Sequence, residues 1–309
     1  MAREDPELAA RWRLLAVCPA PFDRALAAAV WDVTGSIARD GLSELVRWSL
    51  VEYDRESGLY SLHDLLGELA GPPDEAAVRR HAQYVLQEAR SANDRFKKGG
   101  DAVQEAQARF AFLWPHLQAV WQHMQAWDDG AARRWLCDFG YAFINLLDLR
   151  TTPAERIPYQ QAALTAARAL GDRKAEGAHL GNLGLAYAAL GRVEEAIQHY
   201  QQALAISREI GDRRGEGNHL GNLGNAYRDL GRVEEAIQHY QQALAISREI
   251  GDRRGEKRWL TFLGGVQFLA RHPLYRRFLL LLQGTLFRIP LVRRRMSSWS
   301  QSIIKQQLE

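Results

Sequence analysis

Residues 171–210 read GDRKAEGAHLGNLGLAYAALGRVEEAIQHYQQALAISREI, and residues 211–250 repeat this stretch with six changes. The changes lie at positions 174, 175, 178, 185, 188 and 189 of the first copy, and the last twenty residues of the two copies are identical. A repeat of this length is typical of stacked units, none of which can bury its apolar face alone. Stacked units build long recognition surfaces, so the sequence predicts a binding scaffold and not an enzyme.

Each copy is predicted to form two helices joined by a short turn. Apolar residues recur at helical spacing in the first half of the copy, at Leu180, Leu183, Ala186, Tyr187 and Leu190. Gly191 suits the end of the first helix, and Gly211 the end of the second, because glycine readily adopts positive φ. Asp212 can then cap the next helix. Gly184 is expected to lie where two helix backbones approach closely.

The spacing within each copy resembles the tetratricopeptide repeat. The tetratricopeptide motif is about thirty-four residues long. When it is counted from Gly177, its seven signature positions fall on Leu180, Leu183, Gly184, Tyr187, Ala196, Tyr200 and Ala203. Leu180 stands where the motif has Trp, and Arg208 stands where it has Pro. Each unit is six residues longer than this motif, and in this respect it resembles the kinesin-light-chain-like variety of the tetratricopeptide repeat. The resemblance implies a right-handed α-solenoid that binds a protein or peptide along the first helix of each unit.

The repeat array is predicted to span residues 131–255. Residues 131–170 resemble a degenerate copy, and 171–210 and 211–250 are the clean ones. Residues 256–309 are predicted to form a divergent, basic, helical cap, with ten Lys and Arg against two acids. No uncharged run in this tail reaches the roughly twenty residues that span a bilayer. Contact of the tail with an anionic membrane surface or a nucleic acid is the alternative to a cap.

The region before the array is predicted to contain a winged helix, residues 1–71, and a helical spacer, residues 72–130. Helices are expected at Leu8–Val17, Leu26–Trp31 and Gly41–Leu50, and a β-hairpin from Val51 to Leu62. In the spacer, Asp74 can cap a helix that runs to about Asn93, and Asp101 can begin another through Phe112. Tryptophans are expected in the spacer core, at Trp114, Trp121, Trp127 and Trp135. The fold class is therefore mainly all-α, with one small hairpin.

A second resemblance lies at the end of the predicted winged helix. Residues 60–66, YSLHDLL, are similar to the winged-helix segment of NB-ARC-type signal-transduction ATPases, the STAND class. In that family a Met-His-Asp motif lies beside bound ADP, which implies nucleotide contacts for His63 and Asp64, with Leu62 in place of Met. The chain contains no Gly-x-x-x-x-Gly-Lys-Ser/Thr phosphate loop. We therefore expect no cofactor, an inherited structural role for His63, and nucleotide contact only with an ATPase core supplied by another chain.

No spacing in the sequence predicts a catalytic or metal centre. Cys18 and Cys137 lack metal-ligand spacing. His116 and His123 share a helical face, but the sequence places no cysteine or acidic residue beside them that could complete a metal site. The helix expected at residues 41–50 offers only Arg47 to phosphates. DNA binding by this helix or by the basic tail is therefore the less favoured alternative. The N-terminus lacks a signal-peptide run and the two cysteines fit a reducing compartment, which favours the cytoplasm.

Binding residues are predicted on the first helix of each clean copy, at Asn182, Leu185, Asn218, Asn222, Asn225, Arg228 and Asp229. The family resemblance implies that Asn182 and Asn222 hydrogen-bond the backbone of an extended peptide, since an amide offers both a donor and an acceptor. Four of the six differences between the copies fall in this predicted groove. Drift after duplication and diversification of contacts both explain that pattern. If the contacts have diversified, the double substitution of Asn222 and Asn225 by Ala is expected to weaken binding without lowering the melting temperature.

Overall fold

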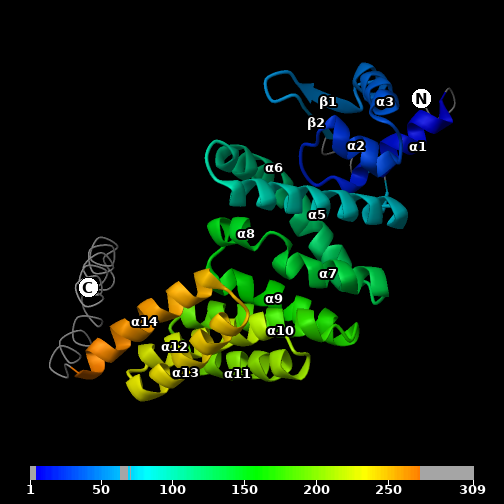
Figure 1. The fold of residues 1–309 in the computed structure, drawn as a ribbon. Coiled ribbons are helices and arrows are strands. Elements are labelled where there is room, and N and C mark those ends of the chain that lie inside the picture. Colours follow the sequence, from blue (N-terminus) through cyan, green and yellow to red (C-terminus); the bar gives the residue numbers. More distant parts are fainter. Residues whose placement is uncertain (1–4, 63–68, 70, 272–309) are drawn as a thin grey trace. The chain divides into compact units, whose positions relative to one another are not determined.

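The computed structural model describes residues 5–62, 69 and 71–271 of the chain. These residues belong to two compact units, Met1–Thr152 and Pro153–Glu309. The first unit is helical with one small sheet, and the second is a succession of helices (Figure 1). Within the described ranges, none of the helices combines the length and the apolar character that a membrane crossing requires.

The first unit begins with three helices and a hairpin. Its elements are α1 (Pro6–Leu14), a 3₁₀ helix (Leu15–Val17), α2 (Arg24–Trp31), α3 (Gly35–Arg47), β1 (Val51–Asp54) and β2 (Leu59–Leu62). The two strands are antiparallel, with Val51 opposite Leu62. Phe22 extends the sheet, because its backbone N–H and C=O each bond Tyr60 at 2.8 Å. This order of helices and hairpin is the one predicted for a winged helix.

Helix α3 begins at Gly35, earlier than the predicted start at Gly41. Gly41 lies inside the helix because it packs against the ring of Trp31, where a Cβ would come within 3.1 Å of a ring carbon. The earlier start adds a second basic residue, Arg39, to Arg47. Both are paired with acids of the same helix, Asp40 and Glu44 respectively, at 3.1 Å each. The longer helix therefore offers no unpaired cation to a phosphate.

The rest of the first unit consists of α5 (Glu75–Lys98), α6 (Ala102–Ala126), α7 (Gly130–Ala142) and α8 (Ile144–Arg150). The predicted cap of α5 is confirmed, because Asp74 Oδ1 accepts from the Ala77 N–H at 2.8 Å. The predicted end at Phe112 is wrong, since α6 continues through Pro115 to Ala126. A proline within a helix removes one backbone donor and is tolerated where packing holds the turn in place.

The aromatic core of the spacer differs from the predicted one. Of its four tryptophans, Trp135 is buried, and Trp114, Trp121 and Trp127 are half-buried. Phenylalanines supply most of the buried rings, namely Phe110, Phe139 and Phe143. Consecutive ring centroids lie about 5 Å apart, at 5.1 Å from Trp135 to Phe139 and 4.9 Å from Phe139 to Phe143. The cluster packs α6 against α7, as expected for a structural core.

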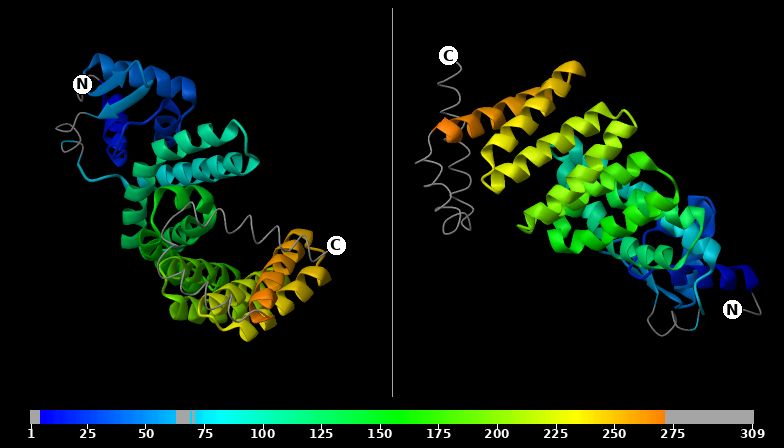
Figure 2. Two further views of the ribbon diagram at one scale, coloured as in Figure 1. Left: turned by 90° about the vertical axis from the view of Figure 1, so that its left-hand side faces the viewer. Right: turned by 90° about the horizontal axis from the view of Figure 1, so that it is seen from below.

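The second unit stacks six helices of similar length in chain order. They are α9 (Pro153–Ala169), α10 (Arg173–Ala189), α11 (Val193–Glu209), α12 (Arg213–Asp229), α13 (Val233–Glu249) and α14 (Arg253–Arg271). Each helix packs against the next, and α10 to α13 lie side by side in both views of Figure 2. Glycines end the helices with positive φ, at +77° for Gly191 and +70° for Gly211. Asp212 caps α12 by accepting from the Gly215 N–H at 2.9 Å, which confirms both predictions.

Close packing between the helices depends on glycines against which aromatic rings pack. A Cβ at Gly184 would lie 2.4 Å from a ring carbon of Tyr200. The expected approach of two backbones is therefore an approach of a backbone to an aromatic ring. Gly221 is closer still, because a Cβ there would lie 2.0 Å from the ring of Trp259 on the following repeat.

Buried glutamates join successive helices of the second unit. Glu176 accepts from Arg168 at 2.9 Å and from Arg173 at 2.5 Å, and its side chain is only 9% exposed. Forty residues later Glu216 accepts from Arg208 at 2.9 Å and also pairs with Arg213. Burial alone would raise the pKa of Glu176, but the two guanidinium groups outweigh it and hold that pKa below its usual range.

Candidate functional site

The residues predicted to bind a partner all lie on α10 and α12. We call them the α10–α12 face, which comprises Asn182, Leu185, Asn218, Asn222, Asn225, Arg228 and Asp229. Leu185 is 50% exposed although it is apolar. Asn218 and Asp229 are exposed, and the other four are half-buried. The face is therefore open to solvent, and one repeat contributes an apolar side chain where the other contributes amides and charges.

Two glycines of the same helices, Gly181 on α10 and Gly221 on α12, are buried. A Cβ at Gly181 would lie 2.7 Å from the imidazole of His219, and Gly221 is covered by Trp259. These positions are occupied by the following repeat, so no ligand can reach them. The spacing alone could not show this, because the covering residue lies about one repeat further along the chain.

The two matched amides of the face are held differently. Asn182 Nδ2 lies 3.5 Å from Oε1 of Gln160, and this buried oxygen is also 3.0 Å from Nδ1 of His179. For Asn222, the described part of the chain supplies no side-chain hydrogen bond. The amide N–H and C=O of Asn222 are therefore both available to a ligand, whereas the Asn182 amide N–H already donates to Gln160.

Asn225 has an internal structural partner. Its Oδ1 accepts from the hydroxyl of Tyr240 at 2.7 Å, and Tyr240 is fully buried. Removing the amide would leave a buried hydroxyl without that acceptor, which costs about 1–3 kcal/mol. The expectation that replacing Asn222 and Asn225 together leaves the melting temperature unchanged is therefore wrong for Asn225. Leu185 occupies this position in the first copy, so the contact belongs to the second copy.

Arg228 and Asp229 form one ion pair on the face. Arg228 Nη2 lies 2.8 Å from Asp229 Oδ1, and the guanidinium lies 5.8 Å from the ring centroid of Phe262 on α14. Adjacent opposite charges leave this end of α12 nearly neutral. A partner that binds at this end of α12 would contact both the Arg228 guanidinium, which donates, and the Asp229 carboxylate, which accepts.

The differences between the two copies are confined to one helix of each pair. All six lie on α10 and α12, whereas α11 and α13 are identical in sequence. The identical helices also have exposed residues, among them Glu194, Gln198 and Gln201 and their counterparts Glu234, Gln238 and Gln241. Solvent exposure alone therefore does not explain which positions differ.

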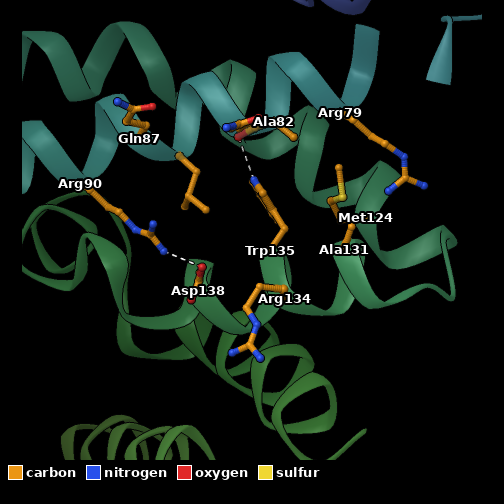
Figure 3. Close-up of a pocket in the computed structure, with 11 residues that line it drawn as sticks. Arg79, Ala82, Gln87, Arg90, Met124, Ala131, Arg134, Trp135 and Asp138 are labelled. Carbon is orange, nitrogen blue, oxygen red and sulfur yellow. Dashed lines mark hydrogen bonds and ion pairs between the residues drawn. The ribbon is translucent and has the colours of Figure 1, made fainter. Parts of the chain in front are cut away.

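A pocket of about 430 Å³ opens in the first unit between α5, α6 and α7. Trp135 points from α7 toward α5, where its Nε1–H donates to the Ala82 carbonyl at 2.9 Å (Figure 3). Arg90 reaches Asp138 at 2.6 Å across the same pocket. The sequence analysis assigned Trp135 to the spacer core, and its bond to Ala82 agrees with that role.

A buried cluster of potential metal ligands lies elsewhere in the first unit. Cys18, His81 and His116 each place one ligand atom within 4.8 Å of the others. The sequence analysis missed this group because its members come from three separate elements. Its one usable signal was the pair of histidines on helices expected to pack together.

The two residues implied by the NB-ARC resemblance, His63 and Asp64, lie outside the described residues. Their implied nucleotide contacts therefore remain a prediction.

A family model decides the identity of the second unit. The tetratricopeptide repeat model matches residues 155–209 and 215–273. The second unit is a tetratricopeptide repeat array. Tetratricopeptide repeats are protein-interaction modules and are typically non-catalytic. The match includes α14, so the array continues into a third copy beyond the two nearly identical ones. No curated protein sequence matches the chain.

Several solved structures are similar in fold. A STAND protein with a tetratricopeptide repeat sensor from Pyrococcus horikoshii is 15% identical, over 92% of this chain and 58% of that chain, with a TM-score of 0.37. A putative kinesin light chain with nearly identical repeats from Podosopora anserina is 16% identical over 66% of this chain and 95% of its own, at 0.45. Aspartyl phosphate phosphatase F from Bacillus subtilis is 13% identical over 92% and 85%, also at 0.45. The chain spans less than two thirds of the length of the STAND protein.

Proposed function

We propose that the chain is a non-catalytic scaffold that binds an extended peptide segment of a protein partner along the α10–α12 face. The observation that carries the proposal is the placement of the repeat differences. Both helices of a repeat have exposed residues, yet every change between the copies lies on the helix that carries the face. Drift would have spread changes over the exposed positions of both helices, whereas selection for a composite binding surface confines them to one.

The chemistry of the face suits an unfolded or strand-like segment. Asn222 offers one donor and one acceptor, which can meet the N–H and C=O of a peptide backbone. The exposed Leu185 offers an apolar contact about one repeat away. Arg228 and Asp229 offer charges of both signs, so side chains of the segment can be discriminated along the face.

The test begins with a displayed library of random peptides selected on the full chain. The affinity of a selected peptide is then measured for the wild type and for Asn222→Ala, which we expect to weaken binding about tenfold, the value of one or two hydrogen bonds. Leu185→Ala should weaken binding by a similar factor if the segment covers both repeats. Neither change should lower the melting temperature by more than a degree or two, because Leu185 is 50% exposed and the described residues give the Asn222 side chain no hydrogen bond to lose.

Gln241→Ala supplies the matched control, because Gln241 is an exposed amide on the unchanged helix α13. It should leave the affinity unaltered. Peptides that bind Asn222→Ala and Leu185→Ala as tightly as the wild type, or that lose affinity with Gln241→Ala, would place the binding surface elsewhere.

We further propose that the chain derives from an NB-ARC-type signalling ATPase and docks on an ATPase core in another chain. The support is the similarity of residues 60–66 to that family, together with the order of three helices, a hairpin, a helical spacer and repeats. Adding a nucleotide-loaded NB-ARC core to the chain should give a complex that His63→Ala weakens. Absence of any complex at micromolar concentrations would contradict this derivation and would leave the peptide-binding proposal intact.

A further inference from the structure

Three potential metal ligands from different elements meet inside the first unit. Cys18 follows the 3₁₀ helix Leu15–Val17, His81 lies on α5 and His116 lies on α6. The two histidines are 1% and 0% exposed, and Cys18 is half-buried. All three potential ligand atoms lie within 4.8 Å of one another. Buried imidazole and thiol groups that converge in this way need an explanation, because core positions favour apolar side chains.

The hydrogen bonds of the two imidazoles fix their proton positions. His116 Nε2 lies 3.1 Å from the Pro21 carbonyl, which can only accept, so Nε2 carries the proton. Nδ1 of His116 then keeps its lone pair and lies 3.1 Å from Nε2 of His81. In metal sites a ligating histidine typically donates its other ring N–H to a carbonyl in this manner. His116 is therefore oriented as a ligand through Nδ1.

Burial favours the neutral form of both imidazoles. Burial, followed by repulsion from His116 and His123, lowers the pKa of His81 to about 3. Burial also lowers the pKa of His116, although the Pro21 carbonyl and Asp23 oppose that shift. Metal ions bind the unprotonated ring, so these histidines need not lose a charge-bearing proton first.

We propose that Cys18, His81 and His116 form a zinc-binding site. Sulfur and nitrogen donors in this combination select zinc among the common biological cations. Two nitrogens bound to one tetrahedral zinc lie about 3.3 Å apart, close to the observed separation of the two ring nitrogens. The Cys18 sulfur lies within 4.8 Å of the ligand atoms of both histidines and has to approach them by up to about 1 Å to complete the site.

Zinc binding at this site releases one proton. The zinc–sulfur bond forms as the Cys18 S–H bond breaks, and the proton goes to the buffer. The His81 proton moves from Nε2 to Nδ1, so that Nε2 can bind the metal, and His116 keeps its proton on Nε2. Three protein ligands leave the fourth position of the tetrahedron to a water molecule. Burial and then the charge of Asp23 raise the pKa of the Cys18 thiol above its usual range.

The two charged residues that act on His116, Asp23 and Arg109, pair with each other. The carboxylate of Asp23 is shared by Arg109, at 2.6 Å, and by the Leu26 N–H, at 2.8 Å. Asp23 is therefore a neighbour and not a fourth ligand. His123 is the remaining titratable group that acts on His81. No guanidinium or ammonium is bonded to Cys18, His81 or His116 among the contacts of the described residues.

The test uses the full chain freed of metal with a chelator and titrated with cobalt(II) and then with zinc(II). We expect one equivalent of cobalt to produce the near-ultraviolet thiolate charge-transfer band and the visible bands of a tetrahedral site, and zinc to remove them. Zinc affinity should rise about tenfold per pH unit, because one proton leaves for each ion bound. Calorimetry in two buffers of different ionisation enthalpy counts that proton directly.

Cys18→Ser and Cys137→Ser are a matched pair, since Cys137 is the other cysteine and lies outside the cluster. Cys18→Ser should abolish the charge-transfer band and lower zinc affinity on the order of 100-fold, whereas Cys137→Ser should change neither. His116→Gln should also lose the band. Circular dichroism confirms that each variant is folded, and loss of the zinc-induced rise in melting temperature gives a second readout. Absence of the band in the folded wild type, or a band that survives Cys18→Ser, would overturn the site.

Discussion

The two units of the chain use polar contacts in opposite ways. In the second unit a contact recurs every forty residues, as when Arg173 pairs with Glu209 and Arg213 with Glu249. In the first unit the polar contacts do not recur in this way, and several of them join distant parts of the chain. Arg109 reaches Asp23 across 86 residues, and His116 reaches Pro21 across 95.

This difference determines where a single substitution does most damage. A repeated contact is one of several equivalent links, and its energy is local to neighbouring repeats. A side chain that bonds several partners and occurs only once in the unit has no equivalent elsewhere, so its loss is not compensated. The first unit should therefore be sensitive at side chains with several polar partners, such as Arg109. The second unit should be sensitive at the glycines of the two nearly identical repeats that pack against aromatic rings.

The largest effect is expected at Gly221. Gly221→Ala places a methyl group 2.0 Å from the ring of Trp259, so the indole and α14 must move. Overpacking of this severity should lower the free energy of unfolding by about 3 kcal/mol, measured by urea denaturation. Gly41→Ala in the first unit meets the ring of Trp31 at 3.1 Å, where a small shift suffices, and should cost less than about 1 kcal/mol.

Gly264→Ala is the control for both variants, because none of the residues that the structure describes lies within 4 Å of a Cβ built there. Replacing a helical glycine in open space should stabilise α14 by up to about 1 kcal/mol. If all three substitutions shifted the urea midpoint equally, helix propensity and not ring packing would control these positions.

The second prediction compares a polar hub with a repeated ion pair. Arg109 bonds Asp23, Glu88 and Tyr84 at 2.6–2.9 Å, and its side chain is 22% exposed. Arg109→Gln leaves these partners uncompensated and should cost about 2 kcal/mol. Arg213→Gln removes the pairs with Glu249 and Glu216 on a side chain that is 41% exposed, and should cost less than Arg109→Gln because water screens an exposed guanidinium.

Thermal unfolding of the two variants, with salt as a second variable, gives the comparison. The Arg213→Gln difference should shrink at 1 M salt, because exposed pairs are screened, whereas the Arg109→Gln difference should persist. Equal losses for both, or a loss at Arg109 that disappears with salt, would mean that burial does not separate the two kinds of contact.

Acid should reveal His81 as a second single-copy element of the first unit. Its folded pKa of about 3 lies below the ordinary value of about 6.5 in an unfolded chain. The stabilisation is therefore complete above about pH 6.5 and is lost as the pH falls toward 3. Between pH 7 and pH 5 we expect a loss on the order of 1–2 kcal/mol. His81→Gln should flatten this slope more than His199→Gln in the second unit, where burial also lowers the pKa but the ring is half-exposed.

The measurement is urea denaturation of the metal-free chain at several pH values, with chelator present throughout so that zinc cannot contribute. Slopes that His81→Gln leaves unaltered would show that His81 titrates normally in the folded protein.

The comparison of the two units also explains how far the sequence could lead. In the second unit a position read in one copy was checked in the next, so the helix ends at Gly191 and Gly211 and the cap at Asp212 were all predicted correctly. In the first unit the start of α3 and the end of α6 were wrong, because tertiary packing of Gly41 and around Pro115 overrode the local signal. The Cys18, His81 and His116 cluster has no spacing that a sequence pattern could show, since it forms only when α5 and α6 pack together.

The smallest expected effect separates the two nearly identical repeats from each other. The bond from the Tyr240 hydroxyl to Asn225 exists only in the second copy, where the first has Leu185. A double-mutant cycle with Asn225→Leu and Tyr240→Phe should give a coupling of about 1 kcal/mol in the free energy of unfolding. The first copy shows that this repeat accepts leucine at the position, so the variants should fold. The same cycle at Leu185→Ala and Tyr200→Phe should show no hydrogen-bond coupling, because leucine has no acceptor. A coupling near zero in the second copy would instead make Asn225 equivalent to Asn222, free to contact a partner, and would restore it to the binding face without a structural role.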